Sequence, residues 1–280
     1  MKVGGLGVTN LRPSSIEVPE DVAEALAVAG DRVGRLGCRV TWFAEVGSTN
    51  DEAIALANRG AEEGWLVGAD SQSSGRGRHG RTWSSPPGAG LYFSLVLRPP
   101  SHAAPLLTLA AGVGVADGIQ AATGAEPRLK WPNDLYLVSS GSRKVAGILA
   151  EGGTSGTRVD YVVVGVGVNV RKAILPADVA ARATSLEDEL GRPVSRGAVA
   201  AEVCAGIWRR YQELIGEGGQ KIVAAWRSRG VGTFGRGVEW DAGGVTCRGI
   251  ARDIDASGAL VIETEQGLMQ VVAGEVRWTP

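Results

Sequence analysis

The stretch that most constrains the fold is 159–170, whose sequence VDYVVVGVGVNV is dominated by valine. β-branched side chains favour an extended backbone. Polar residues do not alternate with apolar ones here, as they would in a strand with one wet face, so the pattern predicts a strand that is covered on both faces. Because 44% of the chain is hydrophobic, enough apolar residues are available to cover it. The sequence therefore predicts a mixed body of helices and strands with this stretch inside.

Further strands and helices are predicted on either side of that stretch. Strands are expected at 40–46, 65–69, 91–97, 129–131 and 144–151, and helices at 19–29, 49–58, 105–123, 195–215 and 220–229. The helix at 49–58 begins with a capping box, in which Thr49 is the N-cap and Glu52 is the third helical residue. After Thr233, short β-rich runs alternate with turns, which is typical of a small all-β unit.

Charge and composition exclude several functional classes. The chain has 29 basic and 30 acidic residues, so no global attraction to nucleic acid or to an anionic membrane is expected. Three cysteines without a Cys-x-x-Cys pair, and two histidines, predict neither a zinc site nor a disulfide framework. The amino terminus lacks the apolar core of a signal peptide. The apolar stretch 106–119 is shorter than the ~20 residues of a membrane span, so we expect a buried helix and a cytoplasmic protein.

The first candidate ligand-binding element is the loop GRGRHGR at 75–81, which Thr82 and Trp83 follow. Glycine lets a backbone approach a ligand and leaves its amide donors bare. Arginine binds phosphate and carboxylate through paired hydrogen bonds, and three arginines in one loop repel each other unless an anion joins them. The loop is therefore predicted to enclose a polyanion, with Trp83 placed to stack on a nucleobase.

Three other interpretations of this loop stay open on its residues alone. Gly75, Gly77 and Gly80 match the dinucleotide-binding pattern G-x-G-x-x-G, but a turn-forming sequence follows where that fold needs a helix. An arginine–glycine loop that binds RNA is the second alternative, although this loop lies inside an ordered apolar pattern. A solvated surface loop is the third.

The second candidate is Lys130-Trp-Pro-Asn-Asp134, in which Pro132 fixes the backbone and biases Trp131 towards an extended conformation. The same residues also suit a strand that simply ends in a Pro-Asn turn. Lys144 precedes an apolar strand, where it either points into a site or is a solvated hairpin residue.

Three weaker signals accompany these two motifs. They are the polar residues 48–50 at a helix start, Gln72 just before the basic loop, and the glycines within 162–169. Ordinary helix capping explains the first signal equally well, and a β-bulge explains the third.

The ordered set of these segments resembles the biotin–protein ligase family: GSTN at 47–50, QSSGRGRHGRTW at 72–83, KWPND at 130–134, KVAGILAE at 144–151 and VGVGVN at 164–169. The resemblance covers the chain from about residue 40 onward. It implies an α+β fold with a mixed β-sheet flanked by helices, related to class II aminoacyl-tRNA synthetases, and a small C-terminal SH3-like β-barrel. The expected parts are a peripheral segment with a short helix at 1–38, a catalytic domain at 39–231 and the SH3-like domain at 232–280.

The family reaction, as implied by the resemblance, has two steps and uses biotin and ATP with Mg²⁺ as substrates, without a tightly bound prosthetic group. The carboxylate of biotin attacks the α-phosphate of ATP and gives biotinyl-5′-AMP and pyrophosphate. A lysine amine of a carrier protein then attacks the mixed anhydride and releases AMP. Because anions meet in the first step, positioning and preorganised positive charge are the useful tools.

The resemblance also assigns residues. Biotin-binding residues are Ser48, Thr49, Asn50, Gln72, Arg76, Gly77, Arg78, Lys144 and Gly147. Residues that bind ATP or the adenylate are Arg78, Arg81, Trp83, Lys130, Asn133, Asp134, Lys144 and Asn169. Arg78 is expected to retain the adenylate and Lys144 to neutralise the carboxylate and α-phosphate oxygens. Asp134 either orients Mg-ATP or accepts the proton of the incoming amine. His79 and the cysteines receive no role.

The expected partner is the biotin carboxyl carrier domain of acyl-CoA carboxylases. DNA is not expected as a partner, since the chain lacks room for the N-terminal winged helix-turn-helix of family members that repress transcription. A membrane is not expected either, because the charge is balanced and the apolar stretch is short. A homodimer along a sheet edge is compatible with the sequence.

The nearest alternative is a lipoate–protein ligase or octanoyl transferase, which shares the fold but lacks the pairing of GRGRxGR with KWPND. A nucleic-acid-binding module that uses the Arg/Gly loop would show salt-dependent binding without ATP turnover. A non-catalytic biotin sensor is a third alternative, and the intact Arg78 and Lys144 argue against it.

Overall fold

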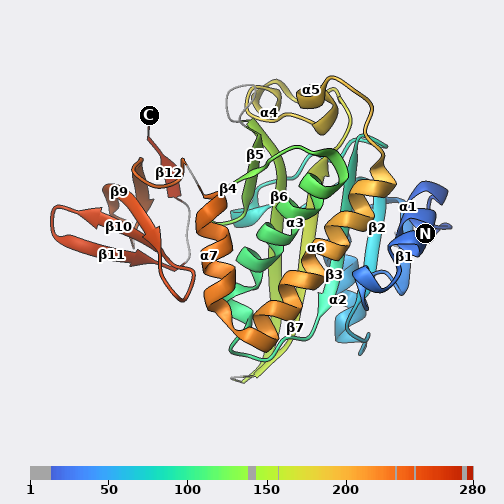
Figure 1. Ribbon diagram of the computed structural model, residues 1–280, viewed down its shortest axis with the longest axis horizontal. Coiled ribbons are helices and arrows are strands. Elements are labelled where there is room, and N and C mark those ends of the chain that lie inside the picture. The colour runs from blue at the N-terminus through green and yellow to red at the C-terminus, as the bar shows by residue number, and fades with distance from the viewer. Residues whose placement is uncertain are drawn as a thin grey trace, which may run out of the picture.

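The computed structural model describes residues 14–137, 143–156, 158–230, 232–242, 244–272 and 276–279. Its larger sheet has seven strands in the order β1-β2-β3-β7-β6-β5-β4 (Figure 1). The strands are β1 (Arg39–Val46), β2 (Trp65–Gln72), β3 (Gly90–Leu97), β4 (Arg128–Lys130), β5 (Asp134–Leu137), β6 (Arg143–Ser155) and β7 (Arg158–Asn169). β1 and β2 are parallel, and the other neighbouring strands are antiparallel, so the sheet is mixed.

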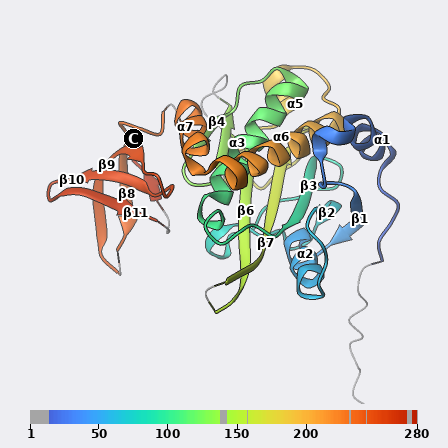
Figure 2. The ribbon, with the colours of Figure 1, turned by 60° about the horizontal axis from the view of Figure 1, so that its bottom comes forward.

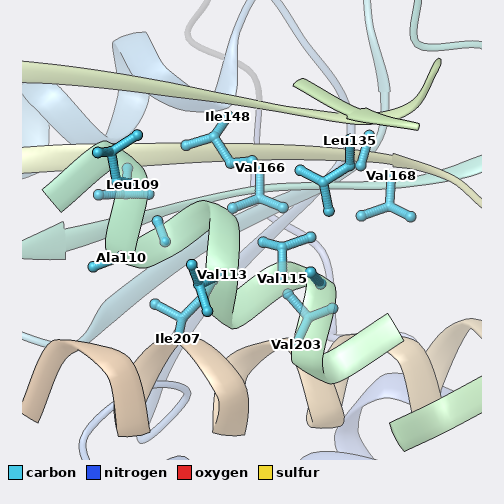
Figure 3. Packing of buried hydrophobic residues seen from close by; sticks show 14 of the residues in the cluster. Leu109, Ala110, Val113, Val115, Leu135, Ile148, Val166, Val168, Val203 and Ile207 are labelled. Carbon is cyan, nitrogen blue, oxygen red and sulfur yellow. The ribbon is translucent and has the colours of Figure 1, made fainter. Parts of the chain in front are cut away.

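Helices flank this sheet. They are α1 (Glu20–Ala29), α2 (Thr49–Asn58), α3 (Leu107–Thr123), α4 (Ala177–Ala180), α5 (Leu186–Leu190), α6 (Arg196–Glu217) and α7 (Gly219–Arg229), with 3-10 turns η1 (Gly30–Val33), η2 (Arg78–Gly80) and η3 (Ala104–Leu106). On one face α3 is sandwiched between the strands and α6, as Figure 3 shows. On the other face α2 packs on β2, β3 and β7 and has its own apolar cluster.

The central strand is β7, which is covered on both faces as its sequence predicts. Val162, Val164, Val166 and Val168 belong to the large core beneath α3, and Val163, between the first two, belongs to the smaller core with Ala53 of α2. All five valines are 6% exposed or less. The alternation follows from the twofold period of a strand.

The helix α3 is the buried helix expected from the apolar stretch 106–119. The segment Ala104–Thr123 is long and apolar enough to cross a membrane by composition, but 72% of its most apolar window is buried inside the fold. It packs closely on α6, because a Cβ on Gly118 would lie 2.4 Å from the Cα of Val203. Burial against the sheet and α6 explains its hydrophobicity.

The second sheet follows α7 and lies beside it in both ribbon views (Figures 1 and 2). Its order is β11-β10-β9-β8-β12, with β8 (Gly237–Asp241), β9 (Thr246–Ile254), β10 (Leu260–Thr264), β11 (Gly267–Val271) and β12 (Val276–Trp278). All its pairs are antiparallel, consistent with the expected SH3-like unit. The fold is thus α+β with a mixed sheet flanked by helices, as predicted. The domain borders stay predictions, and residues 1–13 and Val231 lie outside the described residues.

Candidate active site

A cavity of about 310 Å³ lies along β6 and β7, between the start of α2, the basic loop and α4. Every residue to which the resemblance assigns a role lines it: Ser48, Thr49, Asn50, Gln72, Arg76, Gly77, Arg78, Arg81, Trp83, Lys130, Asn133, Asp134, Lys144, Gly147 and Asn169. These residues come from segments far apart in sequence. Their individual roles stay predictions, and the structure contributes their convergence on one cavity.

One end of the cavity, here called the head-group end, is formed by residues 48–50 and Gln72. The backbone N–H and the hydroxyl of Thr49 are 2.9 and 3.2 Å from Oε1 of Gln72, and Nε2 of Gln72 donates to Oγ of Ser85 at 2.8 Å. The N-cap of α2 is Ser48, so the predicted capping box with Thr49 as N-cap is wrong. Tertiary hydrogen bonds engage the Thr49 hydroxyl instead.

The hydroxyl of Ser48 lacks such a partner. Ser48 is 2% exposed, and its Oγ makes no hydrogen bond to the described residues. An unpaired buried hydroxyl costs free energy, and native proteins rarely leave one without a partner. A ligand with a polar head bound at this end would provide one.

The basic loop folds back on itself. The N–H of Trp83 donates to the carbonyl of Gly75 at 2.8 Å, and the N–H of Gly77 donates to the carbonyl of Arg81 at 2.7 Å. A Cβ on Gly75 would lie 2.6 Å from the carbonyl oxygen of Trp83, so the close approach requires glycine. The 3-10 turn η2 ends on the last glycine of the motif, and no α-helix follows it within the described residues before β3. The dinucleotide-binding alternative, which needs an α-helix there, is therefore wrong.

The indole of Trp83 lies on paired glycines of β6 and β7. A Cβ on Gly167 would be 2.5 Å from the Trp83 ring, and one on Gly147 would be 3.0 Å from it. Gly147 and Gly167 are register partners in a regular part of the ladder. The glycines of 162–169 therefore mark close approach of side chains rather than a bulge. The buried Nε1 of Trp83 has no hydrogen-bond partner in the described part of the chain.

The other end, here called the cationic end, contains Lys144 and Lys130. Nζ of Lys144 is 2.5 Å from Oδ1 of Asp134 and 5.1 Å from the centroid of the Trp83 ring. Nζ of Lys130 lies 5.1 and 5.4 Å from the ring centroids of Tyr136 and Trp278. The site thus holds both lysines against aromatic faces, where cations are attracted to the ring.

Burial lowers the pKa of two cationic side chains at this end. The pKa of Lys130 is lowered mainly by burial, against which the charge of Asp134 acts. The pKa of Arg78 is also lowered mainly by burial, with Asp134 opposing and Arg81 adding to the shift. Desolvation disfavours the charged forms, so an entering anion would be stabilising.

The charges that line the cavity are strongly unbalanced. The cationic residues are Arg76, Arg78, Arg81, Lys130, Lys144 and Arg182, while Asp134 is the carboxylate among the described lining residues. Carboxylates outside the lining pair with two of these cations, since Arg76 contacts Asp51 and Glu151 and Arg182 contacts Asp178. This excess is local, because the whole chain has a net charge of -1. The cavity therefore suits a ligand with several negative charges.

Two amides fasten the walls of the cavity. Nδ2 of Asn133 donates to the carbonyl of Ile148 at 2.6 Å, and the N–H of Ile148 donates back to Asn133 at 3.0 Å. Nδ2 of Asn169 donates to the carbonyl of Thr184 at 3.0 Å. The first pair holds the KWPND turn on β6. Asn169 ties β7 to the segment that follows α4.

Sequence reasoning missed several residues of the site. Glu151 is the last residue of the KVAGILAE motif and bonds to both Asn50 and Arg76. Ser94 is a lone hydroxyl within the apolar strand LYFSLVL, a signal that a buried polar partner exists. Trp278 of the second sheet lines the cavity because that unit docks beside β4, and no local pattern announces this contact.

Comparisons with known proteins match both parts of the chain. Residues 42–169 match the Biotin/lipoate A/B protein ligase family, and residues 233–277 match the Biotin protein ligase C terminal domain. The biotin--[acetyl-CoA-carboxylase] ligase of Mycobacterium tuberculosis is 37% identical over 241 residues, which is 83% of this chain and 86% of the relative. The bifunctional ligase/repressor BirA of Bacillus subtilis is 34% identical over 267 residues, 93% of this chain and 80% of the relative.

The fold has solved counterparts as well. A structure described as biotin protein ligase from Aquifex aeolicus in complex with biotin and ATP has a TM-score of 0.73 and 28% identity, and the match covers 86% of this chain and 99% of that one.

Proposed function

This chain belongs to the biotin protein ligase family, and we propose that it forms biotinyl-5′-AMP from biotin and ATP and transfers the biotinyl group to a lysine of the biotin carboxyl carrier domain of an acyl-CoA carboxylase. It is a ligase enzyme, and biotin and ATP are its substrates. The observation that carries the finer proposal is the cavity itself. It joins a neutral, hydrogen-bonded end to a cationic end, as a molecule with an uncharged polar head and a phosphate-bearing tail requires.

In the first step two anions must approach each other. We assign Lys144 to the carboxylate of biotin and the α-phosphate, because its ammonium lies inside the cavity between Asp134 and the Trp83 ring. Preorganised positive charge at this point lowers the cost of bringing the two anions together. Arg78, a half-buried cation of the loop, would hold the adenylate until the acceptor arrives.

Mg²⁺ enters as part of the ATP substrate. Asp134 suits contact with it, because carboxylate oxygens are ligands that Mg²⁺ prefers and this carboxylate lines the cavity. The same oxygens suit a second role as acceptor of the proton that the attacking lysine amine loses. A Mg²⁺ titration of the Asp134→Asn variant separates the two roles, since only the first predicts a raised Mg²⁺ requirement.

The proposal contains no repressor role and no membrane partner, and it keeps the cytoplasm as the expected compartment. The described residues that precede β1 form α1 and η1, which pack on α6. A homodimer along a sheet edge stays a prediction, which light scattering of the purified protein at several concentrations tests.

The decisive experiment is exchange of labelled pyrophosphate into ATP, with biotin, lipoate and octanoate as separate acids. Exchange with biotin alone supports the activating half-reaction. Exchange with lipoate instead would move the chain to the lipoate branch of the matched family. A carboxyl carrier domain with its acceptor lysine changed to arginine serves as the control in the transfer step, and labelling of that control would contradict the proposed acceptor.

A further inference from the structure

Glu151 contacts two parts of the site, the head-group end and the basic loop. It stands on β6 opposite Val163 of β7, and its side chain is 24% exposed. Its Oε2 accepts a hydrogen bond from Nδ2 of Asn50 at 2.8 Å, and its Oε1 accepts one from the guanidinium of Arg76 at 2.7 Å. One carboxylate therefore holds both the head-group end and the basic loop.

The bond from Glu151 fixes which way the Asn50 amide points. A carboxylate can only accept, so the NH₂ group of Asn50 must face Glu151 and its carbonyl oxygen must face the opposite side. There Oδ1 lies 2.6 Å from Oγ of Ser94, a fully buried residue. A Cβ on Gly165 would lie 2.1 Å from the same Oδ1, so the amide is packed tightly against β7.

The orientation of the Asn50 amide also affects the hydrogen bonds of Thr49, because Ser94 contacts both residues. Because Oδ1 of Asn50 can only accept, the single hydroxyl proton of Ser94 is used on it. The hydroxyls of Ser94 and Thr49 are 2.8 Å apart, and the Thr49 hydroxyl also lies 3.2 Å from Oε1 of Gln72, so its single proton is donated to one of these two oxygens. The oxygen of Thr49 is left as an acceptor, and Thr49 lines the cavity. The donor and acceptor pattern at the head-group end thus depends on Glu151, which is three hydrogen bonds away from Thr49.

The second contact of Glu151 is with Arg76 of the basic loop. The guanidinium of Arg76 is held by Glu151 and, at 2.5 Å, by Oδ1 of Asp51. The pKa of Arg76 is raised, chiefly by the hydrogen bond to Asp51. Its charge is thereby matched by protein carboxylates. Arg76 fastens the basic loop to α2 and β6.

We propose that Glu151 is a positioning residue that sets the hydrogen-bonding pattern for the polar head of biotin and, through Arg76, also fastens the basic loop beside it. This inference rests on the proposed function for the identity of the ligand. Glu151 itself contacts no substrate in this scheme. Its effect reaches biotin through Asn50, Ser94 and Thr49.

Glu151 acts along two arms, one through Asn50 to Thr49 and one through Arg76 to the basic loop. Three variants separate them. Glu151→Gln removes the charge and the fixed polarity, and it affects both arms. Asp51→Asn weakens the fastening of Arg76 without touching Asn50. Ser94→Ala breaks the chain between Asn50 and Thr49 without touching Arg76. Thermal unfolding of each variant shows whether it is folded, and the two single-arm variants test the proposal independently of Glu151→Gln.

The first readout is pyrophosphate exchange as a function of biotin concentration. Loss of an oriented hydrogen-bond chain that ends on a charged group should raise the KM for biotin about tenfold to hundredfold in Glu151→Gln, and about tenfold in Ser94→Ala. The ratio of kcat/KM for biotin over that for 2-iminobiotin, whose head has an N–H where biotin has its carbonyl oxygen, should fall in both variants. Asp51→Asn should leave this ratio unchanged.

The second readout is tryptic cleavage within 76–81 with and without biotin and ATP. Cleavage should be faster in Asp51→Asn and in Glu151→Gln, and unchanged in Ser94→Ala. A Glu151→Gln protein that is folded but has the parental KM, discrimination ratio and cleavage rate would overturn the proposal. Failure of the proposed function is a separate result, because it would appear as absent biotin-dependent exchange in the parent protein, while the cleavage comparison still tests the fastening of the loop.

Discussion

The two ends of the cavity hold their side chains in different ways. At the head-group end, Thr49, Asn50 and Gln72 are joined to one another or to buried neighbours by hydrogen bonds between 2.6 and 3.2 Å. At the cationic end, burial lowers the pKa of Arg78 and Lys130, and Lys144 lies against Asp134. The first end is organised before a ligand arrives. The second holds buried cations whose charged forms an incoming anion would stabilise.

This difference predicts two kinds of sensitivity. Recognition at the head-group end depends on the direction of particular hydrogen bonds, so isosteric substitutions should matter and ionic strength should not. Recognition at the cationic end depends on charge, so it should respond to salt, to pH and to the number of phosphates on the ligand. Each prediction below tests one end against the other.

The largest effect is expected from Lys144→Ala. Removal of its ammonium leaves Asp134 as an unpaired carboxylate where two anions must meet, so kcat for adenylate formation should fall by about 10²–10³-fold. Pyrophosphate exchange at saturating biotin and ATP measures it. Arg182→Ala, which removes another cation from the cavity lining, is the matched control and should have a much smaller effect. Unchanged adenylate formation in Lys144→Ala would remove this residue from the first step.

Arg78→Gly should change the fate of the adenylate rather than its formation. The guanidinium is expected to hold the intermediate through charge-assisted hydrogen bonds, so its loss should increase release of free biotinyl-5′-AMP by about tenfold or more. Chromatography of the released adenylate, together with labelling of an unrelated protein in the same tube, measures the effect. Arg81→Gly is the comparison, with a raised KM for ATP and parental retention. Equal release from the Arg78→Gly and parent enzymes would contradict the retention role.

Thr49→Val probes the head-group end with a nearly isosteric change. It removes one acceptor for the ligand and the bonds to Gln72 and Ser94, so the KM for biotin should rise about tenfold. Because these contacts are made equally in the ground state and in the transition state, kcat at saturating biotin should stay within about twofold of the parent value. A parallel fall of kcat and kcat/KM would show that this end also contributes to the chemistry.

The difference between the two ends also explains what the sequence predicts well. The cationic end is built from short motifs, GRGRHGR and KWPND, whose residues keep their chemistry wherever the chain places them. The buried strand at 159–170 is equally local, because its valines reveal coverage on both faces. These features could be inferred from neighbours in sequence.

The head-group end resists such prediction because its bonds join distant residues. The sequence predicts Thr49 as the N-cap, but its hydroxyl contacts Gln72 and Ser94 in the fold, and Ser48 is the N-cap. Glu151 reaches Asn50 across 101 positions. Trp278 enters the cavity because the second sheet docks beside β4, where Nε1 of Trp131 donates to the carbonyl of Gly258 at 3.0 Å. Only the assembled fold brings these groups together.

The smallest predicted effect is a pH dependence that belongs to the cationic end. Burial lowers the pKa of Lys130 in the folded protein from its ordinary value of 10.5. Between the two pKa values the unfolded chain binds more protons at this site, so the site's contribution to the stability of the unliganded protein rises with pH across that window. Arg78 stays protonated there, because the arginine guanidinium does not lose its proton in proteins.

Binding of ATP should reverse this dependence, because phosphate favours the charged form of Lys130 and draws a proton onto it. The thermal unfolding midpoint of the parent and of Lys130→Met, measured from about pH 8 to pH 10 with and without ATP, isolates the contribution of this lysine. The stabilisation by ATP should decline with rising pH more steeply in the parent than in the variant, while stabilisation by biotin should show no such difference. Identical pH profiles for the two proteins would mean that Lys130 does not carry the charge that ATP meets, and the cationic end would then depend on Lys144 and the arginines of the loop.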